Sequence, residues 1–197
     1  MSFSMSKLAY HISNFFSANL VSVYLLIPVS LNSNTSLYIT IPVGILLMGI
    51  LPIILILYDS RKEEIDIFVS DRRKRTKYFL VAIFSYAIGS IFFYYVVYDS
   101  LQFNYYLAYF AVTTFDMLVT LRWKISVHVS GVAGPVTFLV MKISNIYAIL
   151  YIILIPVAWA RYSLRAHTKW QLLGGALSAP LVTYVSVNYI APLCGVY

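Results

Sequence analysis

Long apolar runs, separated by short polar stretches, make up most of this chain. Seven apolar segments follow one another, at about residues 13–31, 38–58, 78–98, 104–121, 130–142, 146–160 and 170–190. A helix of about 20 predominantly apolar residues is long enough to cross the hydrocarbon core of a bilayer. The fifth and sixth segments are shorter, and we interpret them as a hairpin of two helices sheltered by their neighbours. The pattern predicts an all-α bundle of seven membrane spans, or six if the hairpin is wrong.

Composition narrows the class of protein. Hydrophobic residues make up 61% of the chain and charged residues 11%, against about 45–50% and 25% in soluble domains. With a mean hydropathy of +0.82, these values exclude an ordinary soluble globule and a disordered chain. They also exclude a nucleic-acid binder despite the net charge of +7, because such long apolar segments leave little aqueous surface for a basic face. We predict that residues 1–197 form a single helical domain embedded in the membrane.

The basic residues gather in the loops of one face. By parity, the loops after the second, fourth and sixth spans share a side of the membrane, and they hold seven, two and three of the 14 Lys and Arg residues. The positive-inside rule places such a face in the cytoplasm of a multi-pass cell-membrane protein. A phosphate-binding site would also collect bases on one face, whichever side it served.

The third of these loops, at about residues 161–171, carries the most informative spacing. Arg161 precedes His167 by six residues and Gln171 follows it by four. On a helix His167 and Gln171 would share a face, so the amide could orient the imidazole for nucleophilic or base chemistry. An Arg beside it supplies a planar fork for phosphate oxygens. The bland alternative is a set of basic residues at a membrane edge.

The other two loops offer complementary groups. Between residues 122 and 131, Lys124 and His128 are four apart, and Ser130-Gly131 could open a helix whose free N–H groups bind an anion. The bland reading is an N-cap serine beside a boundary histidine. The loop at about residues 59–77 ends in a basic run that includes Arg72 and Arg75. That run is either a topological stop signal or an anion trap.

Taken in order, the three loops resemble the motifs of the type-2 phosphatidic acid phosphatase and vanadium haloperoxidase superfamily. Arg161-x5-His167-x3-Gln171 is similar to its third motif, Arg-x5-His-x3-Asp, and Ser130-Gly131 to the core of its second, Pro-Ser-Gly-His. The basic run is similar to its first, Lys-x6-Arg-Pro. The similar region covers about residues 60–178.

The resemblance implies a phosphatase-like helical core and metal-free phosphoester hydrolysis. His167 would be the nucleophile that forms a phosphohistidine, and His128 the acid that protonates the leaving group. Arg161, Arg75, Arg72 and Lys124 would bind the phosphoryl oxygens, together with Ser130 and Gly131. The expected substrate is a phosphatidate-like lipid or a polyprenyl phosphate or diphosphate of the dolichyl or undecaprenyl type.

The chain departs from the family pattern in each motif. Gln171 replaces the Asp, Val132 stands where the second-motif His would follow Gly131, and Phe68 stands seven residues before Arg75 in place of the Lys. Thr76 replaces the Pro. These changes indicate a variant branch, in which Lys124 could substitute for the missing Lys.

Other classes of membrane protein fit less well. The spans hold one carboxylate, Asp116, so we expect no metal and no cofactor. The aspartate-rich motifs of a prenyltransferase are missing, and the last span lacks the Lys of a retinal protein. A non-catalytic subunit or a transporter, with basic loops that serve topology alone, stays open as the alternative.

Overall fold

The computed structural model describes residues 3–196, and helices are the regular structure found there. They are α1 (Phe3–Phe15), α2 (Ala18–Leu31), α3 (Leu37–Gly44), η1 (Ile45–Ile50), α4 (Leu51–Arg61), η2 (Arg72–Lys74), α5 (Thr76–Tyr95), α6 (Ser100–Thr120), α7 (Val127–Lys142), η3 (Asn145–Ile153), α8 (Leu154–Ser163), α9 (Lys169–Val185), η4 (Ser186–Ile190) and α10 (Ala191–Leu193). No strand occurs within that range. The all-α prediction is therefore confirmed.

Within residues 3–196, four continuous helical segments are long and apolar enough to span a membrane: Leu37–Arg61, Thr76–Tyr95, Asn145–Ser163 and Lys169–Leu193. The pair α1 and α2 adds a fifth if it is one bent span. The predicted spans at α6 and α7 do not meet the same criteria, because α6 is less apolar and α7 has only 16 residues. The membrane class is supported, and the count by length and composition is four to five.

The predicted span at residues 13–31 has the wrong start. Helix α1 ends at Phe15, Ser17 adopts an extended conformation as the N-cap of α2, and the two helices meet at 50°. Helix α1 packs against α8 instead of continuing the direction of α2. This bend brings the end of α1 to the basic loops.

Backbone carbonyls in the irregular helical turn before Pro52 accept hydrogen bonds from neighbouring helices, as expected in a membrane bundle. The π-helical turn η1 precedes Pro52. The Leu47 carbonyl accepts a hydrogen bond from Ser85 at 2.5 Å, and the Met48 carbonyl accepts one from Ser22 at 3.2 Å. These bonds tie the broken helix to α5 and α2.

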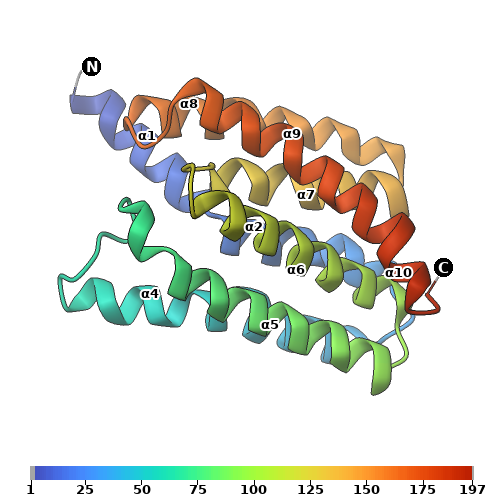
Figure 1. Cartoon of the computed structure of the whole chain (residues 1–197). Helices are drawn as coiled ribbons and strands as arrows, with labels where there is room; N and C mark the ends of the chain where they lie inside the picture. The colour runs from blue at the N-terminus through green and yellow to red at the C-terminus, as the bar shows by residue number, and fades with distance from the viewer. Residues whose placement is uncertain (1–2, 197) are drawn as a thin grey trace.

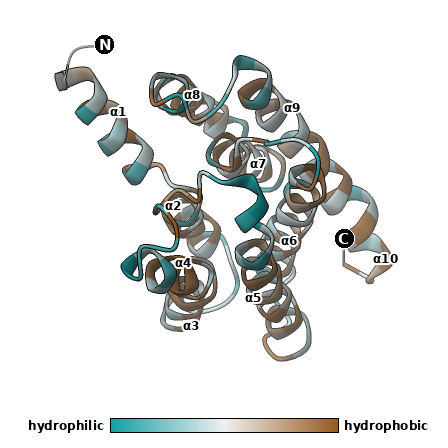
Figure 2. Ribbon diagram, turned by 60° about the vertical axis from the view of Figure 1, so that its left-hand side comes forward, coloured by the Kyte–Doolittle hydropathy of each residue, from teal (hydrophilic) through white to brown (hydrophobic). Residues whose placement is uncertain are grey.

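Helices α6 and α7 form the centre of the bundle. Tyr105, Tyr106 and Phe138 are completely buried there. The N-terminus and the α4–α5 and α8–α9 connections lie at one end of the bundle, and the C-terminus and the α5–α6 turn lie at the other (Figure 1). Hydrophilic residues are concentrated in the connecting segments, including η2, while most of the helical surface is hydrophobic (Figure 2). The basic loops therefore lie at the same end of the bundle, as the alternation of spans and loops predicts.

Candidate functional site

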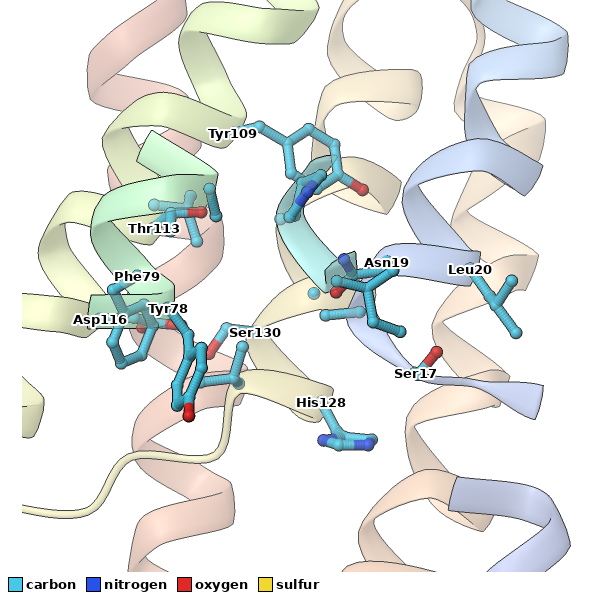
Figure 3. Close-up of a pocket in the computed structure, with 18 of the residues that line it drawn as sticks. Ser17, Asn19, Leu20, Tyr78, Phe79, Tyr109, Thr113, Asp116, His128 and Ser130 are labelled. Atoms are coloured by element: carbon cyan, nitrogen blue, oxygen red, sulfur yellow. The ribbon is translucent and has the colours of Figure 1, made fainter. Parts of the chain in front are cut away.

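A cavity of about 380 Å³ lies in the bundle, and one end of it is lined by residues at the end of the bundle that carries the basic loops. Its polar end is lined by Arg75, His128 and His167, with Asp116 and Ser130 beside them. Figure 3 shows His128 below Ser130 on α7, with Asp116 on α6 and Ser17 at the α1–α2 break facing the same space. Side chains from all three predicted motif loops therefore meet around one cavity.

His167 lies in the short connection between α8 and α9 and is only 5% exposed. Its Nδ1 has no hydrogen-bond partner. Burial lowers the pKa of the imidazole most, and the positive charges of Arg161, Arg75 and Lys124 lower it further, to about 3. The ring is therefore neutral near pH 7, which is the form that can act as a nucleophile.

Arg161, in the last turn of α8, is the largest fully buried side chain among the described residues. Its guanidinium carbon lies 4.7 Å from the centroid of the Phe68 ring, and Nη1 donates a hydrogen bond to Ser13 Oγ at 3.4 Å. Its Nε has no partner. A guanidinium that stacks on a ring keeps its edge available for planar oxyanions.

Arg75 caps the start of α5 and is 6% exposed. Its Nε donates to the Val69 carbonyl at 2.8 Å and Nη1 donates to the Ile125 carbonyl at 3.4 Å. Burial lowers the pKa of Arg75, and the negative charges of Asp66 and Asp116 oppose that shift. Since the guanidinium pKa starts far above neutrality, Arg75 stays charged beside the cavity.

Arg161, Lys124 and Arg72 do not line the cavity, but the charges of Arg161 and Lys124 act on His167, which does. The pKa of Lys124 is lowered by burial and then by the charges of Arg75 and Arg161, so the three cations influence one another. Arg72 instead uses Nη1 to bind the Thr120 carbonyl at 2.8 Å and the Leu121 carbonyl. Because its guanidinium binds these carbonyls at the end of α6, the predicted phosphate-binding role of Arg72 is not what its contacts indicate.

The predicted helix start at Ser130-Gly131 is also wrong. Helix α7 begins at Val127 with Ser126 as its N-cap, and the Ser130 N–H already donates to the Ser126 carbonyl at 3.0 Å. A Cβ on Gly131 would lie 2.6 Å from the Ala18 Cβ. Gly131 thus serves the close approach of α7 to α2, and the N–H of Ser130 is not free for an anion.

His128 lies in the first turn of α7, where its Nε2 is buried without a hydrogen-bond partner. Its ring packs edge-to-face on Phe68, with centroids 5.8 Å apart. Arg161, His167 and Arg75 lie close enough to His128 to interact with it electrostatically. The same cations therefore act on both histidines, His128 from the first turn of α7 and His167 from the α8–α9 connection.

Gln171 does not share a helix face with His167, because α9 begins only at Lys169. The N-cap is Thr168, whose N–H donates to Gln171 Oε1 at 3.1 Å and whose Oγ1 accepts from the Gln171 N–H at 3.3 Å. This capping box fixes the start of α9. The Gln171 side chain also acts on His167, since it raises the pKa against the larger lowering by burial and by the cations.

Four residues near the site were not predicted. Ser13 comes from α1, Phe68 and Asp66 from the α4–α5 loop, and Ser126 is a fully buried N-cap whose Oγ has no partner. Asp66 accepts hydrogen bonds from the Phe68 N–H at 3.1 Å and the Ser70 N–H at 2.8 Å. Asp-x-x-x-Ser is a recognisable loop-closing pattern, whereas nothing in the sequence marks Phe68 as a partner of Arg161.

Within the part of the chain that the structure describes, the cations of the site form no ion pair with a carboxylate. Across residues 3–196, no carboxylate oxygen lies within 4.0 Å of the charged nitrogens of Arg75, Lys124 or Arg161. Asp116 is 1% exposed and its Oδ1 has no partner. The same range contains no group of three or more His, Cys, Asp and Glu residues that could hold a metal. Buried charges are ordinarily paired, so the cluster is complementary to an anion.

Comparisons with family models, with curated proteins and with solved structures gave no match to this chain.

Proposed function

We propose that this chain is an integral-membrane phosphatase that hydrolyses the phosphate or diphosphate of a lipid through a phosphohistidine on His167, without a metal. The observation that carries the proposal is a set of three cations without an ion pair, the buried Arg75 and Arg161 and the half-buried Lys124, around a neutral imidazole. Phosphoryl transfer depends mainly on positioning and on positive charge arranged in advance around the phosphoryl oxygens. The three cations and the histidine supply both requirements.

In the first step, a ring nitrogen of His167 attacks phosphorus, and the bond from phosphorus to the leaving oxygen breaks. Arg161, Arg75 and Lys124 balance the charge on the phosphoryl oxygens. His128, protonated once the anion is bound, gives its proton to the leaving alcohol or phosphate. In the second step His128 takes a proton from water, the resulting hydroxide attacks phosphorus, and inorganic phosphate leaves as the N–P bond breaks.

The position of the site in a membrane protein favours a lipid as the substrate. The cluster lies at one end of the helical bundle, beside a cavity with an apolar lining. A lipid phosphate can place its head group there while its chains stay in an apolar environment. The proposal includes a phosphatidic acid phosphatase-like core of six to seven spans, with α6 and α7 counted as spans and the basic end in the cytoplasm. Polyprenyl phosphates, polyprenyl diphosphates and phosphatidate are the lipids to test.

Release of inorganic phosphate by the purified protein in detergent tests this proposal. With EDTA present, the protein should release phosphate from a polyprenyl phosphate or from phosphatidate. His167→Ala should abolish turnover, and Arg161→Ala should lower kcat/KM by roughly two orders of magnitude or more, as expected when a preorganised charge is lost.

Arg165→Ala is the matched control, because Arg165 is exposed in the same loop. It removes one positive charge and should leave kcat/KM nearly unchanged. Activity that disappears on chelation and survives His167→Ala would contradict the mechanism.

A further inference from the structure

The cavity does not end at the charged groups but continues along α6 and α7 into the bundle. On α7 its lining runs from His128 to Phe138, and on α6 from Asp116 to Tyr105. At 1.5 Å per residue these stretches are roughly 15 Å long. That depth is about half of the ~30 Å hydrocarbon core. The charged end and the deep end thus belong to one continuous space.

The deep part of the cavity suits an apolar chain. It is lined by Ala82, Ala108, Val112 and Phe138 and by the rings of Tyr86, Tyr105 and Tyr109, of which Figure 3 shows Tyr109. Such walls offer no cation to a second phosphate. The charged side chains and the histidines of the lining lie instead at the end that holds His128, His167 and Arg75, while the polar groups of the deep part are the hydroxyls of tyrosines and threonines. The distribution matches an amphiphile whose anionic head and apolar chain occupy opposite ends.

The volume sets how much of a lipid can enter. An engineered cavity of about 150 Å³ holds one benzene, so by proportion 380 Å³ holds on the order of fifteen carbon atoms. One alkyl chain or a short run of prenyl units fits that volume. The two long chains of a diacyl lipid do not.

The cavity also reaches the membrane-facing side of the bundle. Leu20 on α2 and Ile53 on α4 both line it, and both are partly exposed, Leu20 at 41%. The opening therefore lies between α2 and α4, where the surface is apolar. A chain can enter from the bilayer by this route without passing through water.

We infer that the cavity is a binding site for a single apolar chain, so that the substrates are single-chain lipid phosphates of the alkyl or prenyl type. This inference rests on the proposed function for the position of the head group. The apolar chain of the lipid lies along α6 and α7. Ala108 and Tyr109 line the deep part of the cavity and so limit the length of lipid chain that fits. Because a chain in the bilayer is already in an apolar environment, the cavity selects by shape and length.

Cavity-filling and cavity-enlarging variants test the inference. Octyl and hexadecyl phosphates are the probes, with phenyl phosphate as a substrate that lacks a chain. Ala108→Phe should lower kcat/KM for hexadecyl phosphate at least tenfold and leave phenyl and octyl phosphates within about twofold, since an octyl chain fills only roughly half of the cavity. Tyr109→Ala should shift the preference toward hexadecyl phosphate.

Leu118→Phe is the control, because Leu118 is 57% exposed on the same helix. It should change no ratio between substrates. Equal losses for all three phosphates in Ala108→Phe, together with no shift in Tyr109→Ala, would overturn the inference. So would a kcat/KM for a diacyl phosphatidate that equals the value for hexadecyl phosphate.

A binding measurement separates this inference from the proposed function. Hexadecyl phosphate should raise the Tm of the wild-type protein in detergent, and Ala108→Phe should remove that rise while inorganic phosphate still gives its own. If no phosphate ester is hydrolysed but these Tm shifts appear, the phosphatase proposal fails and the chain site stands. If esters are hydrolysed without the length effects, the chain site fails alone.

Discussion

The guanidinium of Arg161 rests on the ring of Phe68, with its central carbon 4.7 Å from the ring centroid. The same ring contacts His128 from the side. Phe68 stands seven residues before Arg75, where the resembled family has a lysine. In this chain the aromatic ring at that position packs against Arg161, and the positive charge of Arg161 in turn lowers the pKa of Lys124.

Replacing Phe68 should therefore weaken phosphate recognition through Arg161. Phe68→Leu keeps an apolar side chain but removes the cation–π attraction, which is about 1–2 kcal/mol at a desolvated site. We expect kcat/KM to fall roughly tenfold, and the inhibition constant of inorganic phosphate to rise by a similar factor. Phe68→Trp should retain both values, and a loss in Phe68→Trp as large as in Phe68→Leu would contradict the stacking role.

His167 should stay neutral across the physiological range. Its pKa of about 3 in the unliganded protein lies below the ordinary value of 6.5 because of burial and three nearby cations. The unfolded chain binds a proton at this histidine below about pH 6.5, so its contribution to stability falls as pH drops from there toward 3. The NMR signal of the His167 imidazole should not titrate between about pH 5 and 8.

Bound phosphate should raise the pKa of His167, because its negative charge offsets the positive charges of Arg161, Arg75 and Lys124 that lower this pKa. His167→Ala identifies the signal among the three histidines. A titration midpoint near 6.5 without ligand would contradict the buried, cation-rich environment.

Gly131 should matter for helix packing and not for phosphate binding. In Gly131→Ala the new Cβ would meet the Ala18 Cβ at 2.6 Å, and overpacking of this kind costs about 1–3 kcal/mol. The Tm in detergent should fall, and Ala18→Gly in the same chain should restore part of the loss. Any folded fraction should keep the phosphate affinity of the wild type; unchanged Tm with lost affinity would return Gly131 to the phosphate site.

Gln171 should act mainly on the stability of α9. Loss of its capping box in Gln171→Ala should lower the free energy of unfolding by about 1 kcal/mol, with less than a tenfold fall in kcat/KM. Gln171→Glu keeps the box and should keep the stability. A fall in kcat/KM as large as that of Arg161→Ala, without a change in Tm, would show a direct role in catalysis.

The alternation of spans and loops was sufficient to predict that the three basic clusters lie at one end of the bundle. Parity decides the end of the bundle at which a loop emerges, and long apolar runs are reliable signals. The start of a helix is a more local matter. Ser126 and Ser130 are both plausible N-caps by residue type, so the residue pattern alone placed the start of α7 too late. Several positions before Gln171 are also plausible N-caps, so the pattern placed His167 on a helix although α9 begins after it.

Contacts between segments far apart in the sequence could not be predicted from the order of apolar and polar residues. The hydrogen bond from Arg161 to Ser13 depends on the 50° break after α1, and a run of apolar residues reads the same on both sides of that break. The stacking of Arg161 on Phe68 depends on the path of the α4–α5 loop, which Asp66 closes through the backbone of Phe68 and Ser70. Loop paths of this kind come from tertiary packing and not from periodicity.

The most direct test of the account is to trap the covalent intermediate. The protein is mixed with a single-chain lipid phosphate, quenched in alkali, which preserves phosphohistidine, and digested for mass spectrometry. The phosphohistidine mechanism predicts phosphate on the peptide that contains His167 and none in His167→Ala. It predicts more phosphate in His128→Ala with a good leaving group, because the water that hydrolyses the intermediate then lacks its base. Turnover that continues with no phosphate on His167, or with phosphate on another residue, would contradict it.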